Sequence, residues 1–74
     1  MIKVYTLPTC PICDMIKKKL KAKNVDYIER PFEELLNTVD TDRAPAIQII
    51  NDNDPDNYVY LLSPMEMNKW IEAM

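Results

Sequence analysis

The chain has 74 residues, a net charge of −3 and 47 % hydrophobic residues, which is typical of one small folded domain that does not bind nucleic acid. It contains no histidine, which excludes Ser-His-Asp and Cys-His catalysis and every zinc site with an imidazole ligand. It contains no glycine, which excludes glycine-rich phosphate and dinucleotide loops and leaves reactive chemistry to carboxylates, lysines and two cysteines.

The first half of the chain predicts a strand followed by a helix. The strand should cover Ile2–Thr6, a short β-branched segment. The helix should start at Pro11, whose missing N–H would be unpaired in a first turn anyway. Apolar residues recur every fourth position to about Lys23, and Asn24 then suits the left-handed conformation that ends helices. Five lysines are expected to lie in solvent near the C-terminal end of this helix: Lys17, Lys18, Lys19, Lys21 and Lys23.

The middle of the chain predicts three more strands and a short helix. A strand should cover Val25–Glu29, and apolar residues at helical spacing predict a short helix over 32–39. An apolar strand should follow over Ala46–Ile50, then a polar turn over Asn51–Asp56 and a fourth strand over Tyr58–Leu61.

The last element has the clearest start. Ser63, Pro64 and Glu66 fit a capping box with Ser63 as the N-cap, and apolar residues at helical spacing follow to the C-terminus. The order βαβαββα predicts a single α/β domain over 1–74. It should hold one four-stranded mixed sheet flanked by three helices, with the first two strands parallel and the last two antiparallel.

The reactive motif is Cys10-Pro11-Ile12-Cys13, between the first strand and the first helix. Unpaired N–H groups and the positive end of the helix dipole should stabilise the Cys10 thiolate and lower its pKa below the usual value of about 8.5. Cys13 lies one turn further on the same face, close enough for a disulfide and expected to be more buried. An exposed attacking thiol and a buried resolving thiol suit thiol–disulfide exchange. Lys17, one turn beyond, either adds positive potential or is simply solvated.

Three other roles compete with exchange chemistry for this motif. A zinc site needs four ligands and only two cysteines are present. A structural disulfide would close a tiny loop and constrain the unfolded chain little. Two inert core cysteines are the remaining alternative. Three alternating aspartates, Asp52 to Asp56, suggest half a calcium loop, but Asn57 replaces its glycine and Ser63 its closing glutamate, so no metal is expected.

The segment Thr9-Cys10-Pro11-Ile12-Cys13, following a strand within βαβαββα, resembles the glutaredoxins and glutaredoxin-like redoxins of the thioredoxin fold. The resemblance spans essentially the whole chain. It implies a thioredoxin-like fold with Cys10 and Cys13 as the catalytic pair. It also implies that Ala44-Pro45 is a cis peptide facing the cysteines and aligning the substrate. The substrate-binding residues implied are Thr9, Pro11, Ile12, Arg43, Ala44 and Pro45.

Several positions differ from the members that use glutathione. Leu7 stands where they usually have a lysine or arginine, Ile12 where they have an aromatic residue, and Leu61-Leu62-Ser63-Pro64 where they have a Gly-Gly pair and an aspartate. Arg43 either supplies a compensating charge or pairs with a neighbouring aspartate. The tryptophan-serine-glycine-phenylalanine signature of relatives that serve ribonucleotide reductase is also missing.

We therefore expect a dithiol-disulfide oxidoreductase in which Cys10 attacks a protein disulfide or a glutathione mixed disulfide and Cys13 resolves the intermediate. Glutathione or thioredoxin reductase would be the reductant, with glutathione as a co-substrate and no bound cofactor. Without a signal-like leader or an apolar stretch of roughly 20 residues, we expect a cytoplasmic monomer without a membrane partner. The alternatives are a glutathione-assisted iron–sulfur cluster carrier, a redox donor to ribonucleotide reductase coupled to thioredoxin reductase, and a non-catalytic interaction module.

Overall fold

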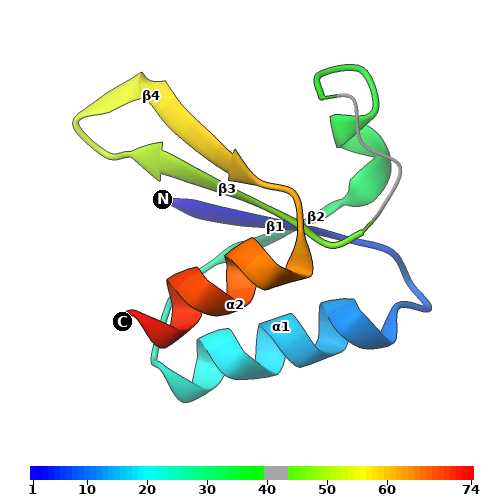
Figure 1. The fold of residues 1–74 in the computed structure, drawn as a ribbon. Coiled ribbons are helices and arrows are strands. Elements are labelled where there is room, and N and C mark those ends of the chain that lie inside the picture. The colour runs from blue at the N-terminus through cyan, green and yellow to red at the C-terminus, as the bar shows by residue number, and fades with distance from the viewer. Residues whose placement is uncertain (40–43) are drawn as a thin grey trace.

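The structure is a computed structural model that describes residues 1–39 and 44–74. In these residues a mixed sheet holds strands in the order β2-β1-β3-β4 (Figure 1). The parallel pair β1 and β2 and the antiparallel hairpin of β3 and β4 confirm the predicted sheet, and β1 also pairs antiparallel with β3. The strands are β1 (Ile2–Thr6), β2 (Ile28–Pro31), β3 (Ala46–Asn51) and β4 (Asp54–Leu61).

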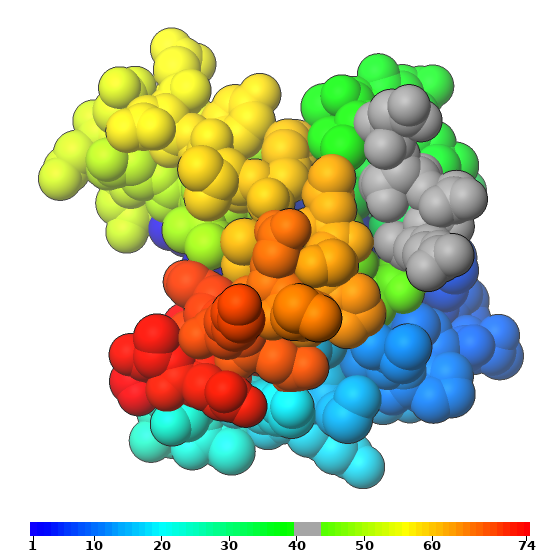
Figure 2. Space-filling view, viewed as in Figure 1, coloured from blue at the N-terminus to red at the C-terminus, as the bar shows by residue number. Residues whose placement is uncertain are grey.

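Two α-helices, α1 (Pro11–Ala22) and α2 (Pro64–Glu72), lie on the same face of the sheet (Figure 1). The surface of α2 adjoins that of α1 (Figure 2), and the Lys19 ammonium donates a 2.6 Å hydrogen bond to Asn68 Oδ1 between them. The main core fills the space between helices and sheet. It contains the buried side chains of Val4, Ile16, Leu20, Ile47, Met67 and Ile71.

The prediction of three flanking helices is wrong for the described residues, which form two α-helices and one short 3₁₀ helix. This 3₁₀ helix, η1 (Phe32–Leu35), packs on the opposite face of the sheet. Phe32 and Leu35 are buried, whereas Leu36 is exposed. Side chains three residues apart align in a 3₁₀ helix, so burying this one pair needs only a single tight turn. Of the apolar residues whose spacing predicted an α-helix over 32–39, only some are buried.

Two predicted boundaries are also wrong. The second strand runs over Ile28–Pro31 and not Val25–Glu29. The reason is that the Val25 N–H donates to the Leu20 carbonyl at 3.0 Å and so closes the end of α1. The Val25 side chain packs against the core from the loop between α1 and β2. The turn expected over Asn51–Asp56 shrinks to two residues, since β4 already starts at Asp54. An edge strand tolerates exposed polar residues and the Pro55 that suggested a loop.

Both predicted helix starts are confirmed, and so is the end of α1. Asn24 has φ 58° after the C-cap Lys23, which is the left-handed conformation expected there. Ser63 is the N-cap of α2, and its hydroxyl accepts the Glu66 N–H at 3.2 Å. These ends fix where α1 begins relative to β1, and therefore where the cysteine loop lies.

Candidate active site

The loop after β1 places Cys10 at the N-cap of α1. Its backbone is extended, with φ −129° and ψ 100°, and Pro11 occupies the first helical position. The Cys13 N–H donates to Cys10 Sγ at 3.1 Å, and the Asp14 N–H donates to the Cys10 carbonyl at 3.1 Å. The sulfur therefore takes the place of the oxygen in an ordinary N-cap, where an unpaired helical N–H stabilises negative charge.

Cys10 and Cys13 are joined by a disulfide, with Cα atoms 5.2 Å apart. Cys10 is half-buried, whereas Cys13 is 1 % exposed and lies on the face of α1 that turns to the core. The predicted contrast between an accessible first cysteine and a buried second one is thus confirmed. Only Cys10 offers a sulfur that an external disulfide can approach.

The Ala44-Pro45 peptide is cis, as the resemblance implied. Tyr5 of β1 pairs with Ala46 of β3, so the cis peptide lies beside the C-terminal end of β1, which leads into the cysteine loop. Pro45 is fully buried, whereas Ala44 is half-buried against the cluster of Tyr5 and Phe32. Register thus brings Ala44 and Pro45 to the cysteine end of the sheet from a distant part of the sequence.

The other predicted binding residues lie around the loop. Thr9 and Pro11 are exposed, and Ile12 is 40 % exposed. Leu7, at the position where glutathione-using relatives carry a basic residue, is also exposed. Arg43 lies outside the described residues.

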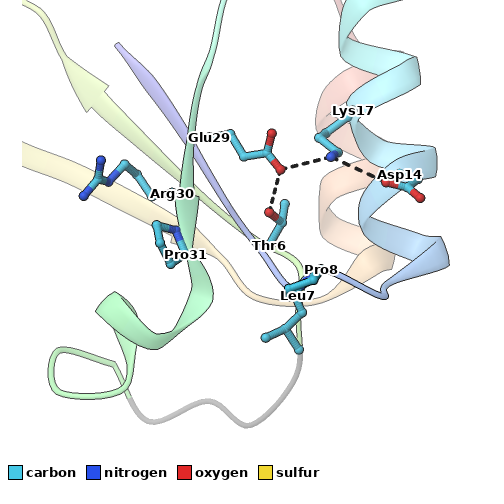
Figure 3. A pocket seen from close by; sticks show the side chains of 8 residues that line it. All are labelled: Thr6, Leu7, Pro8, Asp14, Lys17, Glu29, Arg30 and Pro31. Atoms are coloured by element: carbon cyan, nitrogen blue, oxygen red, sulfur yellow. Dashed lines mark hydrogen bonds and ion pairs between the residues drawn. The ribbon is translucent and has the colours of Figure 1, made fainter.

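A cleft of about 450 Å³ opens beside this loop, between β2 and α1 (Figure 3). Its polar wall is a chain of contacts. The Thr6 hydroxyl donates to Glu29 Oε2 at 2.7 Å, and the Lys17 ammonium donates to the same oxygen at 3.0 Å. Lys17 Nζ also lies 3.5 Å from Asp14 Oδ1. The lining residues are Thr6, Leu7, Pro8, Asp14, Lys17, Glu29, Arg30 and Pro31.

Lys17 is therefore an ion-paired residue and not a simply solvated one. Its hydrogen bond to Glu29 is the main reason that its pKa is raised. The Thr6 hydroxyl, and after it Lys17, holds the pKa of Glu29 below its ordinary value. Sequence reasoning missed Glu29, because its partners come from another strand and a helix. The sequence around Glu29, with Tyr27 and Ile28 before it and Arg30 after it, carries no pattern that marks it.

Residues 1–39 and 44–74 contain neither a metal-binding cluster nor a membrane-spanning helix. No group of three cysteine, aspartate or glutamate side chains there could hold a metal ion. No helix of these residues is long and apolar enough to cross a membrane.

Comparison with known proteins places this geometry in context. The glutaredoxin family model matches residues 2–48. The glutaredoxin-like 8.6 kDa protein in the rubredoxin operon of Clostridium pasteurianum is 32 % identical, over 97 % of this chain and 99 % of that protein. The solved thioredoxin-like protein BC3987 is 28 % identical with a TM-score of 0.63, over 96 % and 99 % of the two chains.

A trimeric glutathione transferase of Leishmania, TDR1, shares the fold with a TM-score of 0.71 at 16 % identity. The match covers 97 % of this chain, which spans only 17 % of the transferase. At this identity the likeness concerns the fold alone. The match with the thioredoxin-like protein BC3987 shows that the thioredoxin-like arrangement extends over nearly all of the chain.

Proposed function

The chain belongs to the glutaredoxin family, and on that premise we propose that it is a thiol–disulfide oxidoreductase with Cys10 as its nucleophile. One observation carries the proposal, the 3.1 Å hydrogen bond from the Cys13 N–H to Cys10 Sγ at the N-cap of α1. In the reduced protein this N–H and the helix dipole stabilise a Cys10 thiolate without a neighbouring base. The lack of histidine is therefore no obstacle to the reaction.

The proposed reaction has two exchanges. The Cys10 thiolate attacks one sulfur of a substrate disulfide, forms a mixed disulfide and releases the first substrate thiolate, which takes up a proton. Cys13 then loses its proton and attacks Cys10 Sγ, forming the Cys10–Cys13 disulfide and releasing the second substrate thiolate. The substrate gains two electrons and the two cysteines lose them. An external thiol or a reductase returns them.

The surface around Cys10 supports a disulfide substrate presented by a protein or as a glutathione mixed disulfide. In this proposal Ala44 and Pro45 align the substrate backbone, and Thr9, Pro11 and Ile12 form the neighbouring contact surface. Glutathione, as a co-substrate, or thioredoxin reductase supplies the electrons, and no cofactor is resident. The protein works as a monomer in the cytoplasm, where a reducing environment keeps the cycle running.

Turnover assays on two variants test the proposed nucleophile. Cys10→Ser should abolish reduction of a small disulfide such as hydroxyethyl disulfide, because a serine hydroxyl does not form the attacking anion near neutral pH. Cys13→Ser should instead accumulate a mixed disulfide on Cys10, detectable as an added mass. Retained turnover in Cys10→Ser would overturn the proposal.

The reductant is tested in a separate NADPH-coupled assay of the unaltered protein. One arm contains glutathione and glutathione reductase, and the other contains thioredoxin reductase alone. Turnover in the glutathione arm would assign glutathione as the reductant, although Leu7 and Ile12 replace the basic and aromatic residues of glutathione-using relatives. Turnover only with thioredoxin reductase would assign the protein to the other electron donor and leave the role of Cys10 intact.

A further inference from the structure

The buried position of Cys13 poses a problem for the second exchange of the proposed function, on which this inference rests. Cys13 is 1 % exposed. Burial raises the pKa of a thiol, because the thiolate loses its hydration. Cys13 must nevertheless become a thiolate before it can attack the mixed disulfide on Cys10. A favourable charge near Cys13 would make that step faster at neutral pH.

Lys17 is placed to supply that charge. It lies one helical turn after Cys13, and residues four apart on a helix have Cβ atoms about 5–6 Å apart on the same face. Its ammonium does not extend freely into solvent. Glu29 Oε2 holds it at 3.0 Å from the neighbouring strand, and Asp14 Oδ1 lies 3.5 Å away on its own helix (Figure 3). The Lys17 side chain is only 24 % exposed, so its charge is partly shielded from water.

The other elements facing this part of α1 add little charge. The residues that β1, β3 and α2 direct toward the core are apolar, namely Val4, Ile47 and Met67. On β2 the charged groups are Glu29, on which Lys21 also acts weakly, and Arg30, whose guanidinium pairs with Glu34. On α1 the ionisable neighbours are Cys10, Asp14 and Lys17. In the described part of the chain, Lys17 is thus the cation nearest to Cys13 along the helix.

We propose that Lys17, positioned by Glu29 and Asp14, stabilises the thiolate of Cys13 during the resolving step. Lys17 bonds to neither sulfur and changes no bond in the reaction. One proton leaves Cys13 and one is taken up by the released substrate thiolate, while the Cys10–substrate disulfide breaks and the Cys10–Cys13 disulfide forms. Glu29 is a positioning residue whose negative charge also partly offsets that of Lys17.

The resolving step can be measured alone. Reduced protein is mixed by stopped flow with an excess of the disulfide 5,5′-dithiobis(2-nitrobenzoate) from pH 5 to pH 10. Attack by Cys10 releases one coloured thiolate and leaves the mixed disulfide, and the second, concentration-independent release reports the attack by Cys13. Lys17→Gln should move the midpoint of the pH profile upward. Each unit of raised pKa leaves tenfold less thiolate, partly offset by its higher nucleophilicity, so release near pH 7 should slow about threefold per unit.

Matched variants separate charge from structure. Lys18→Gln removes an exposed positive charge from the next position and should leave the midpoint unchanged. Lys17→Arg keeps the charge and should stay near the parent. Glu29→Gln breaks the same ion pair as Lys17→Gln but removes a negative charge, so it should move the midpoint downward. If the ion pair were merely structural, the midpoint of the pH profile would move in the same direction in Lys17→Gln and in Glu29→Gln.

Three results would overturn the inference. The first is a shift of the pH midpoint in Lys17→Gln that is no larger than the shift in Lys18→Gln. The second is a midpoint that moves in the same direction in Lys17→Gln and Glu29→Gln. The third is a midpoint in Lys17→Arg that equals the midpoint in Lys17→Gln. Failure of the proposed function looks different, because Cys10 of the parent itself would then not load with the aromatic thiol or would not release it.

Discussion

The two helices begin with the same local structure, yet only one beginning carries a redox group. Each has a capping residue followed by proline at the first helical position, Cys10-Pro11 in α1 and Ser63-Pro64 in α2. In each, the side chain of the cap accepts an N–H from three residues on, at 3.1 Å from Cys13 and 3.2 Å from Glu66. The backbone geometry therefore does not distinguish the two sites.

The difference lies in two side chains, the cap and the residue three positions after it. The cap of α1 is a thiol, which ionises near neutral pH when stabilised, whereas the hydroxyl at the cap of α2 does not. Three residues later, α1 has the second sulfur of Cys13 and α2 has the carboxylate of Glu66. Both helix N-termini thus stabilise a side-chain acceptor at the cap, and the pair of sulfurs turns one of them into a site for exchange.

The strongest test moves the thiol from one cap to the other. The double variant Cys10→Ser, Ser63→Cys should keep its fold, because serine is a good N-cap for α1. Disulfide reduction should fall by roughly 10³-fold or more, as expected when a nucleophile is removed, since Glu66 cannot resolve a mixed disulfide. Coupled turnover and circular dichroism would be measured together. Turnover near the parent rate would mean that any helix N-terminus bearing a thiol suffices.

A second test compares the reactivity of single thiols at the two caps. One protein is Cys13→Ser, which leaves Cys10, and the other is Cys10→Ser, Cys13→Ser, Ser63→Cys. Both should alkylate with iodoacetamide at a midpoint below the usual thiol pKa of about 8.5. The α1 thiol should have the lower midpoint and react about tenfold faster at pH 6, because Glu66 opposes a thiolate at the cap of α2. Equal midpoints would show that the carboxylate has no influence.

The parts of the fold that the sequence predicted correctly are those fixed by local chemistry. Pro11, Asn24 and Ser63 act within one turn of their own position, and the helix ends they predicted are confirmed. The second strand was misplaced because Val25 is β-branched, as strand residues often are, but its N–H donates to the last turn of α1 and not to a neighbouring strand. The helix expected around Leu35 became a 3₁₀ turn, since tertiary packing buries only part of its apolar set.

The candidate site divides in the same way. The cysteine pair and the cis peptide before Ala46 were predicted, because each depends on a short continuous segment that resembles the same segment of the family. The contacts of Glu29 with Thr6 and Lys17 were not. They depend on the register that pairs Glu29 with Val4 across parallel strands, and on where α1 crosses that pair. No single segment holds that information.

A smaller effect is expected when the hydroxyl cap is removed. Ser63→Ala should lower the free energy of unfolding by about 1 kcal/mol, because the Glu66 N–H loses its acceptor. Turnover should stay at the parent rate, since α2 contributes no reacting atom. Urea unfolding and the coupled assay measure the two quantities, and Ser63→Asp should restore the stability. A tenfold loss of turnover in Ser63→Ala would contradict the separation of the two helix starts.

The smallest effect concerns the ion pair that ties the start of α1 to β2, for which α2 has no described counterpart. Glu29 has a pKa lowered from its ordinary 4.5, first by the Thr6 hydroxyl and then by Lys17. A carboxyl with a lowered pKa in the folded state contributes stability above its unfolded pKa, and loses it as pH falls through the folded value. The Glu29 side chain is 48 % exposed, so solvent screening limits this contribution to about 0.5 kcal/mol or less.

Thermal melting of the parent and of Glu29→Gln between pH 6 and pH 3 measures that contribution. The parent should be slightly more stable at pH 6, and the difference should shrink toward pH 3 as Glu29 takes up a proton. Contributions from other carboxyls, including the Arg30–Glu34 pair, are common to both proteins and cancel in the difference. A difference that stays constant over this range would mean that the Glu29 charge does not stabilise the start of α1. The ion pair would then act on the charge near Cys13 and not on the fold.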